Sequence, residues 1–151
     1  MGVTEHAARV VWEGTKEDLR AHRIEVGGLV LRGSASPQWG GDPAAADPEQ
    51  MFVAALSACH MLWFLALARE RRLRVVAYED AASGTLDHDS FAFTGVTLHP
   101  AVEFADDPGW DIASELHREA HRRCYIANSA SIPVEVDPLI RIEDPPPGGI
   151  E

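Results

Sequence analysis

The residues of this chain with the greatest chemical reactivity are its two cysteines, Cys59 and Cys124. A thiol can attack an electrophile, bind a metal or form a disulfide. The chain shows no basic stretch followed by an apolar run at its start, so we expect no secretory signal and a cytoplasmic location. A reducing cytosol disfavours a static disulfide. The cysteines are therefore two inert buried thiols, a redox-active pair or metal ligands, and the elements that carry them must decide.

Cys59 lies in a long helix predicted over residues 47–72. Asp47 is a good N-cap, Pro48 suits the first helical position, and Gln50 completes a pair typical of a capping box. The pattern therefore predicts that this helix begins sharply at Asp47.

The middle of that helix, residues 51–68, is apolar almost all round. Such a helix is either buried in a core or spans a membrane. Eighteen residues are at the lower limit for a span, and Ser57, Cys59 and His60 interrupt the centre. We expect no membrane span, but a helix enclosed by sheet and helices that a second subunit helps to cover.

Cys124 lies near the end of an amphipathic helix predicted over residues 111–126. Leu116, Ala120 and Cys124 are spaced by four residues and so share one face. That apolar face directs Cys124 toward the core that also holds the Cys59 helix. The two cysteines can form a bond if their Cα atoms come within roughly 7 Å of each other.

The remaining periodic segments predict strands and an α+β fold with helices packed against antiparallel sheet. Gly27-Gly28 is expected to form the turn of a hairpin over residues 20–33. The other predicted strands are residues 7–13, 74–86, 91–104 and 132–142. We expect one domain over residues 1–143 and a flexible, Pro- and Gly-rich tail over residues 144–151.

A reactive thiol in an apolar core needs a positive charge nearby, because burial alone favours the neutral thiol. Arginine suits this task since it stays charged when it is desolvated. Arg20, Arg23 and Arg32 lie in or near the predicted hairpin, and Glu49 is a candidate carboxylate partner. Glu49 and Cys59 are ten residues apart on one helix, roughly 15 Å along its axis. Glu49 therefore reaches the thiol only through a long arginine or from another chain.

A metal site is an alternative use of these residues. His117, His121 and Cys124 follow the spacing H-x-x-x-H-x-x-C on one helix, and two histidines one turn apart can bind zinc. The glutamate between the histidines is in the third place, so the string is not the zinc-protease motif. A non-catalytic binding protein with two buried thiols is the other alternative.

The charge of the chain limits its partners. The formal net charge is −11, whereas nucleic acids and anionic membranes require a basic face. We therefore expect neither nucleic acid nor membrane as a partner.

Four segments together resemble a known family, the OsmC/Ohr family of cysteine-based peroxidases. The resemblance extends from about Val10 to Asp137 and is closest to an OsmC-like subgroup. The segments are Asp47-Pro48-Glu49-Gln50, Ala55-Leu56-Ser57-Ala58-Cys59-His60-Met61-Leu62, Ala120-His121-Arg122-Arg123-Cys124-Tyr125-Ile126-Ala127-Asn128-Ser129 and Val134-Glu135-Val136.

The resemblance implies an OsmC-like fold in which sheets wrap a central helix, and an intertwined homodimer with its sites at the interface. It implies Cys59 as the thiolate that attacks an organic hydroperoxide and Cys124 as the thiol that resolves the product. Glu49 matches the acidic residue of the family's Pro-Glu step. Arg20 fits the family's arginine best by position, and Arg23 is second. The expected partners are the hydroperoxide and a dithiol reductant of the lipoyl or thioredoxin type, and no cofactor is expected.

Overall fold

The computed structural model describes residues 2–143, and its contacts divide the chain into two units. The first unit covers residues 1–52 and the second covers residues 53–151. Each unit is described by itself below. The flexible tail predicted over residues 144–151 lies outside the described residues, and the single domain expected over residues 1–143 stays a prediction.

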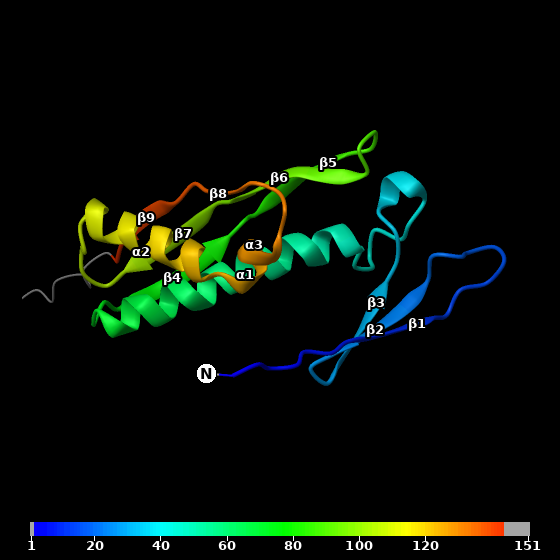
Figure 1. The fold of residues 1–151 in the computed structure, drawn as a ribbon, viewed down its shortest axis with the longest axis horizontal. Helices are drawn as coiled ribbons and strands as arrows, with labels where there is room; N and C mark the ends of the chain where they lie inside the picture. Colours follow the sequence, from blue (N-terminus) through cyan, green and yellow to red (C-terminus); the bar gives the residue numbers. More distant parts are fainter. Residues whose placement is uncertain (1, 144–151) are drawn as a thin grey trace, which may run out of the picture. The chain divides into compact units, whose positions relative to one another are not determined.

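The first unit begins with a three-stranded antiparallel sheet in the order β1-β2-β3 (Figure 1). The strands are β1 (Arg9–Trp12), β2 (His22–Val26) and β3 (Leu29–Gly33). Gly27 and Gly28 form the turn between β2 and β3 with φ angles of 54° and 81°. Glycine adopts such positive φ values without the steric penalty of a Cβ atom, so the predicted hairpin is confirmed at its predicted turn.

The first unit ends in a short 3₁₀ helix, η1 (Pro37–Trp39), and the start of helix α1 (Pro48–Glu70). The Gln50 amide donates to Asp47 Oδ1 at 2.7 Å, and the Asp47 amide donates to Gln50 Oε1 at 3.3 Å. These reciprocal bonds make the predicted capping box, which satisfies two amides that the helix cannot.

The second unit contains six strands where the sequence predicts three. They are β4 (Val75–Asp80), β5 (Ser83–Asp87), β6 (Ala92–Leu98), β7 (Pro100–Phe104), β8 (Val134–Val136) and β9 (Leu139–Ile142). They form two sheets in the orders β4-β7-β9 and β5-β6-β8. The predicted strands 74–86, 91–104 and 132–142 are therefore each broken in two, and each half joins a different sheet. Asp80 stabilises two of these breaks, because its Oδ1 accepts the His99 amide at 2.7 Å.

The pairing in these sheets is mixed rather than wholly antiparallel. The pairs β4/β7 and β5/β6 are antiparallel, as expected, whereas β6/β8 and β7/β9 are parallel. Parallel neighbours need a long crossover connection. Helices α2 (Trp110–Arg123) and α3 (Tyr125–Ser129) supply it between β7 and β8. The helix predicted over residues 111–126 is thus interrupted at Cys124, whose ψ of 106° is extended.

The core of the second unit lies between α1, β7 and α2 (Figure 1). Its buried members are Phe64, Leu67 and Ala68 of α1, Val102 and Phe104 of β7, and Ala113, Leu116 and Ala120 of α2. The predicted apolar face of α2 is confirmed, since Leu116, Ala120 and Cys124 are all buried.

Helix α1 is less enclosed within one chain than its composition predicts. Leu56, His60, Phe64, Leu67 and Ala68 form its buried stripe. Its exposed apolar residues are Ala54, Ala55, Ala58, Leu62 and Ala66. By length and composition alone α1 is able to cross a membrane, a test that core helices also pass.

Two histidines join α1 to α2 inside this core. His60 Nε2 and His117 Nδ1 are 3.0 Å apart, and their ring planes are parallel. The Phe64 ring stacks on His117 with centroids 4.3 Å apart. Burial lowers the pKa of His60 to about 4 and that of His117 to about 3. Both rings are therefore neutral at physiological pH.

This neutral pair predicts a loss of stability in acid. The unfolded histidines bind protons near pH 6.5, whereas the folded ones do so only near pH 4 and 3. The stability that the neutral histidines contribute is fully present above pH 6.5 and is lost as the pH falls through 4. Two neighbours have smaller, opposite effects on the pKa of His60. His121 lowers it and the Asp80 carboxylate raises it. At about 1.4 kcal/mol per pKa unit, we expect each histidine to account for a loss on the order of 3 kcal/mol of unfolding free energy over this range.

Urea unfolding between pH 7 and 4 checks this expectation. His117→Gln should flatten the pH dependence, and His6→Gln, which changes an exposed histidine, should leave it as in the wild type. Equal slopes in the His117 variant and the wild type contradict the explanation.

Candidate functional site

The structure brings Cys59 and Cys124 together. Cys59 is half-buried on α1, and Cys124 is buried between α2 and α3 with 1% of its surface exposed. Both are free thiols, and Cys59 lies close enough to Cys124 to raise the pKa of the Cys124 thiol. The two helices thus bring their cysteines near each other, although only Cys124 is buried.

The two thiols lie in different environments. Burial, and to a smaller extent the neighbouring Cys59, raise the pKa of Cys124 to about 11. The Ala127 amide opposes this by donating to Cys124 Sγ at 3.4 Å. Cys124 is thus held as a neutral thiol beside the more accessible Cys59.

Aromatic side chains connect α1 with α3 one turn beyond Cys59. Trp63 packs against Tyr125 with ring centroids 5.8 Å apart, and the Arg123 guanidinium lies 5.6 Å from the Trp63 ring centre. Arg123 is a cation that the sequence reasoning missed, because no spacing rule relates position 63 to position 123. Phe64 is fully buried in the core rather than available to a ligand.

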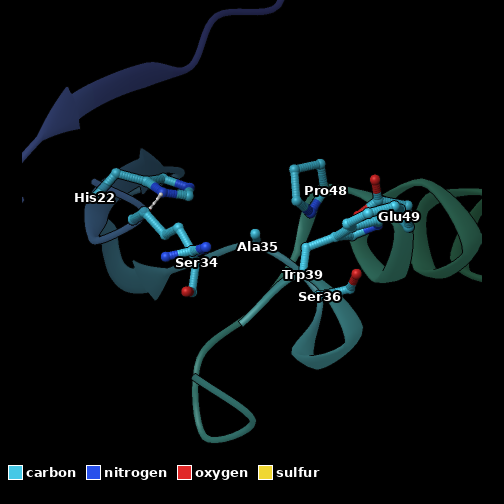
Figure 2. Close-up of a pocket in the computed structure, with 8 residues that line it drawn as sticks. His22, Ser34, Ala35, Ser36, Trp39, Pro48 and Glu49 are labelled. Atoms are coloured by element: carbon cyan, nitrogen blue, oxygen red, sulfur yellow. Dashed lines mark hydrogen bonds between the residues drawn. The ribbon is translucent and has the colours of Figure 1, made fainter. Parts of the chain in front are cut away.

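A cavity of about 230 Å³ in the first unit is lined by the other two predicted site residues, Arg20 and Glu49. His22 and Ser34 lie on one side of it, and Trp39 and Glu49 lie on the other (Figure 2). Trp39 precedes Gly40, whose φ of 75° is in the left-handed region that favours a residue without a Cβ atom. A Cβ there would lie 3.2 Å from an Arg20 guanidinium nitrogen, so glycine also leaves room for that side chain.

The ion pairs distinguish Arg20 from the other arginines of the hairpin. Arg23 binds Glu13 and Glu25, and Arg32 binds Asp42. Arg20 forms no ion pair within the part of the chain that the structure describes. Its charge is therefore available for a ligand or a thiolate, although the pairing with Glu49 that the sequence invited is not formed.

The predicted site residues thus occur as two pairs. Cys59 and Cys124 are in contact in the second unit, and Arg20 and Glu49 line one cavity in the first.

The histidines proposed as metal ligands have other surroundings. His117 Nδ1 is engaged with His60, and Cys124 contacts Cys59. Among residues 2–143, no group of three or more His, Cys, Asp or Glu side chains is arranged to hold a metal ion.

Comparison with known proteins relates the chain to a family of this fold. A family model described as OsmC-like protein matches residues 40–138. An OsmC-like protein of unknown function from Vibrio cholerae is 36% identical, with a TM-score of 0.83, over 91% of this chain and 100% of that one. None of the curated proteins matches the sequence.

More distant solved structures share the fold. An organic hydroperoxide resistance protein from Legionella pneumophila is 21% identical with a TM-score of 0.68, over 92% of this chain and 99% of its own. The organic hydroperoxide resistance protein OhrB of Bacillus subtilis is 23% identical with a TM-score of 0.56, over 91% and 98%. At these identities the likeness supports a common fold.

Proposed function

The chain belongs to the OsmC-like protein family, and on that premise we propose that it is a cysteine-based thiol peroxidase that reduces organic hydroperoxides in oxidative-stress defence. The contact between Cys59 and Cys124 is the observation that carries this proposal. Two thiols in contact, one accessible and one buried and neutral, are suited to an oxidation that ends in a disulfide.

In the first step the Cys59 thiolate attacks the distal oxygen of the peroxide. The O–O bond breaks, an S–O bond forms, and Cys59 becomes a sulfenic acid. The leaving alkoxide takes a proton from water and departs as the alcohol. The sulfur has then lost two electrons, and the peroxide has gained them.

In the second step Cys124 closes the cycle. Its sulfur attacks the Cys59 sulfenic acid, water leaves, and a Cys59–Cys124 disulfide forms. A dithiol reductant of the lipoyl or thioredoxin type then exchanges with this disulfide and restores both thiols. The sum is one hydroperoxide and one dithiol converted to an alcohol, water and the oxidised dithiol.

Arg20 and Glu49 complete the site in this proposal. The Arg20 guanidinium stabilises the thiolate and the developing negative charge on the peroxide oxygen. Glu49 lines the same cavity and is the proposed carboxylate that orients Arg20 when the site is complete. The absence of an ion pair on Arg20 within residues 2–143 supports this role, because its charge is not already neutralised.

Organic rather than hydrogen peroxide is the proposed substrate. The aromatic pair Trp63 and Tyr125 lies one turn from Cys59 and offers apolar surface to an alkyl or aryl group. Solved structures of the same fold are named organic hydroperoxide resistance proteins. We place this activity in the cytosol, where dithiol reductants are available.

A homodimer is the proposed assembly. The apolar surface that α1 leaves exposed, centred on Leu62 with 63% of its surface accessible, is suited to burial against a second copy. The family implies an intertwined dimer with the sites at its interface, which would let one chain contribute Arg20 and Glu49 to the thiols of the other.

Cysteine replacement tests the mechanism. Cys59→Ser should lower turnover of an alkyl hydroperoxide to the background rate, because the attacking sulfur is absent. Cys124→Ser should consume one equivalent of peroxide per chain and then stall as the sulfenic acid. Thiol counting after one equivalent of peroxide should show the loss of two thiols in the wild type. A wild-type protein that loses none is a non-catalytic binder, and multiple turnovers by Cys59→Ser would exclude the mechanism.

Arginine replacement tests the charge assignment. Arg20→Gln should slow oxidation of Cys59 by about a hundredfold, the usual effect of removing one preorganised donor. Arg23→Gln is the matched control, because Arg23 already binds two carboxylates and should change the rate little. The measurement is the second-order rate constant for peroxide consumption under excess dithiol. If the Arg23 variant is the slow one, the assignment to Arg20 is wrong.

The assembly is tested by solution mass. Light scattering at micromolar concentration should give twice the mass of one chain, and Leu62→Glu should dissociate the dimer by placing a charge in its apolar contact. Ile112→Glu, on the exposed side of α2, is the control that should stay dimeric. A monomeric wild type with full activity contradicts a site shared between subunits.

A further inference from the structure

A second cavity of about 320 Å³ lies in the second unit and is lined by residues of α2 and of the segment 134–138, which contains β8. Its polar lining comes from one face of α2 and consists of Ser114, His117, Arg118 and His121. Neither cysteine lines it. The proposed peroxidase chemistry therefore leaves this cavity unused.

Three buried polar atoms of that lining have no hydrogen-bond partner among residues 2–143. They are Ser114 Oγ, His117 Nε2 and His121 Nδ1. His117 has only 3% of its surface exposed. Leaving a buried polar group without a partner is costly, so three on one helix face indicate that water or a ligand supplies their bonds.

The hydrogen bond between the two histidines determines what His117 can offer. When His60 Nε2 donates to His117 Nδ1, the single proton of the neutral His117 ring is on Nε2, at the unpartnered atom. His121 Nδ1 and the Ser114 hydroxyl can also donate. In that tautomer all three groups can donate to an acceptor-only ligand, and a carboxylate is such a ligand.

The charge of the cavity lining also favours an anionic ligand. The lining contains Arg118 and no Asp or Glu, although the chain carries 24 acidic residues and a net charge of −11. Burial keeps His117 neutral, so the permanent positive charge in this lining is that of Arg118. A single guanidinium is matched to a single negative charge.

The rest of the lining is apolar and sets the shape of the ligand. Trp110, Val134, Val136 and Pro138 contribute it. The volume equals that of roughly ten water molecules at about 30 Å³ each. An apolar lining with a few convergent polar groups is the usual form of a small-molecule site.

We propose that this cavity is a second binding site, separate from the thiol pair, for a small monoanionic amphiphile that consists of a carboxylate on an apolar chain or ring. The carboxylate binds Ser114, His117 and His121 with Arg118 at the rim, and the apolar body lies against Trp110 and the β8 side chains.

Binding of octanoate to the full chain tests this site. Calorimetry should give one octanoate per chain at millimolar or lower concentration, and 1-octanol, which has the same chain without the charge, should bind at least about tenfold more weakly. Amide chemical shifts should change at residues 114–121 and 134–138. Octanoate and octanol that bind equally, or octanoate that does not bind, overturn the proposal.

Variants locate the binding. Arg118→Gln should weaken octanoate binding by about tenfold. It should leave the core unaffected, because Arg118 is exposed. Arg122→Gln, one turn further along α2 and outside the cavity, is the matched control and should bind as the wild type does. Cys59→Ser should also keep full octanoate affinity. Loss of binding in Cys59→Ser, or equal losses in both arginine variants, assigns octanoate to another place and overturns the site.

Discussion

The packing of α1 against α2 is the constraint on which the second unit depends. His60 of α1 and His117 of α2 share a hydrogen bond in the core, and Phe64 stacks on His117 one turn along. Cys59 is adjacent to His60 in sequence, and Cys124 lies two turns beyond His117. The contact between the thiols therefore follows from the contact between the helices, and a shift of either helix would separate the sulfurs.

The same core explains why the proposed chemistry needs a charge from elsewhere. It keeps both histidines neutral and Cys124 protonated, because burial disfavours every charged form. A thiolate cannot be stabilised by such surroundings alone. Arg20 is a suitable source, since its cavity lies in a separate unit built on a hairpin and a helix start rather than in the core.

Several of these features were predictable because they depend on neighbours in sequence. The capping box of Asp47 and Gln50, the Gly27-Gly28 turn and the buried stripe of α2 each involve residues within one or two turns. The break at His99 was not predictable from periodicity, since the alternation that includes Val96 and Leu98 continues beyond it to Val102. The Asp80 bond to the His99 amide joins positions nineteen residues apart.

The sequence by itself determined the reactive residue types, the helices that carry them and the family, because caps, turns and helical faces are local properties. Only the tertiary structure decided which groups meet. It placed Cys59 near Cys124 and joined the helices through His117. Among residues 2–143 it left Arg20 without an ion pair, whereas Arg23 and Arg32 have theirs. These outcomes depend on contacts between distant segments, and residue spacing carries no information about how such segments approach each other.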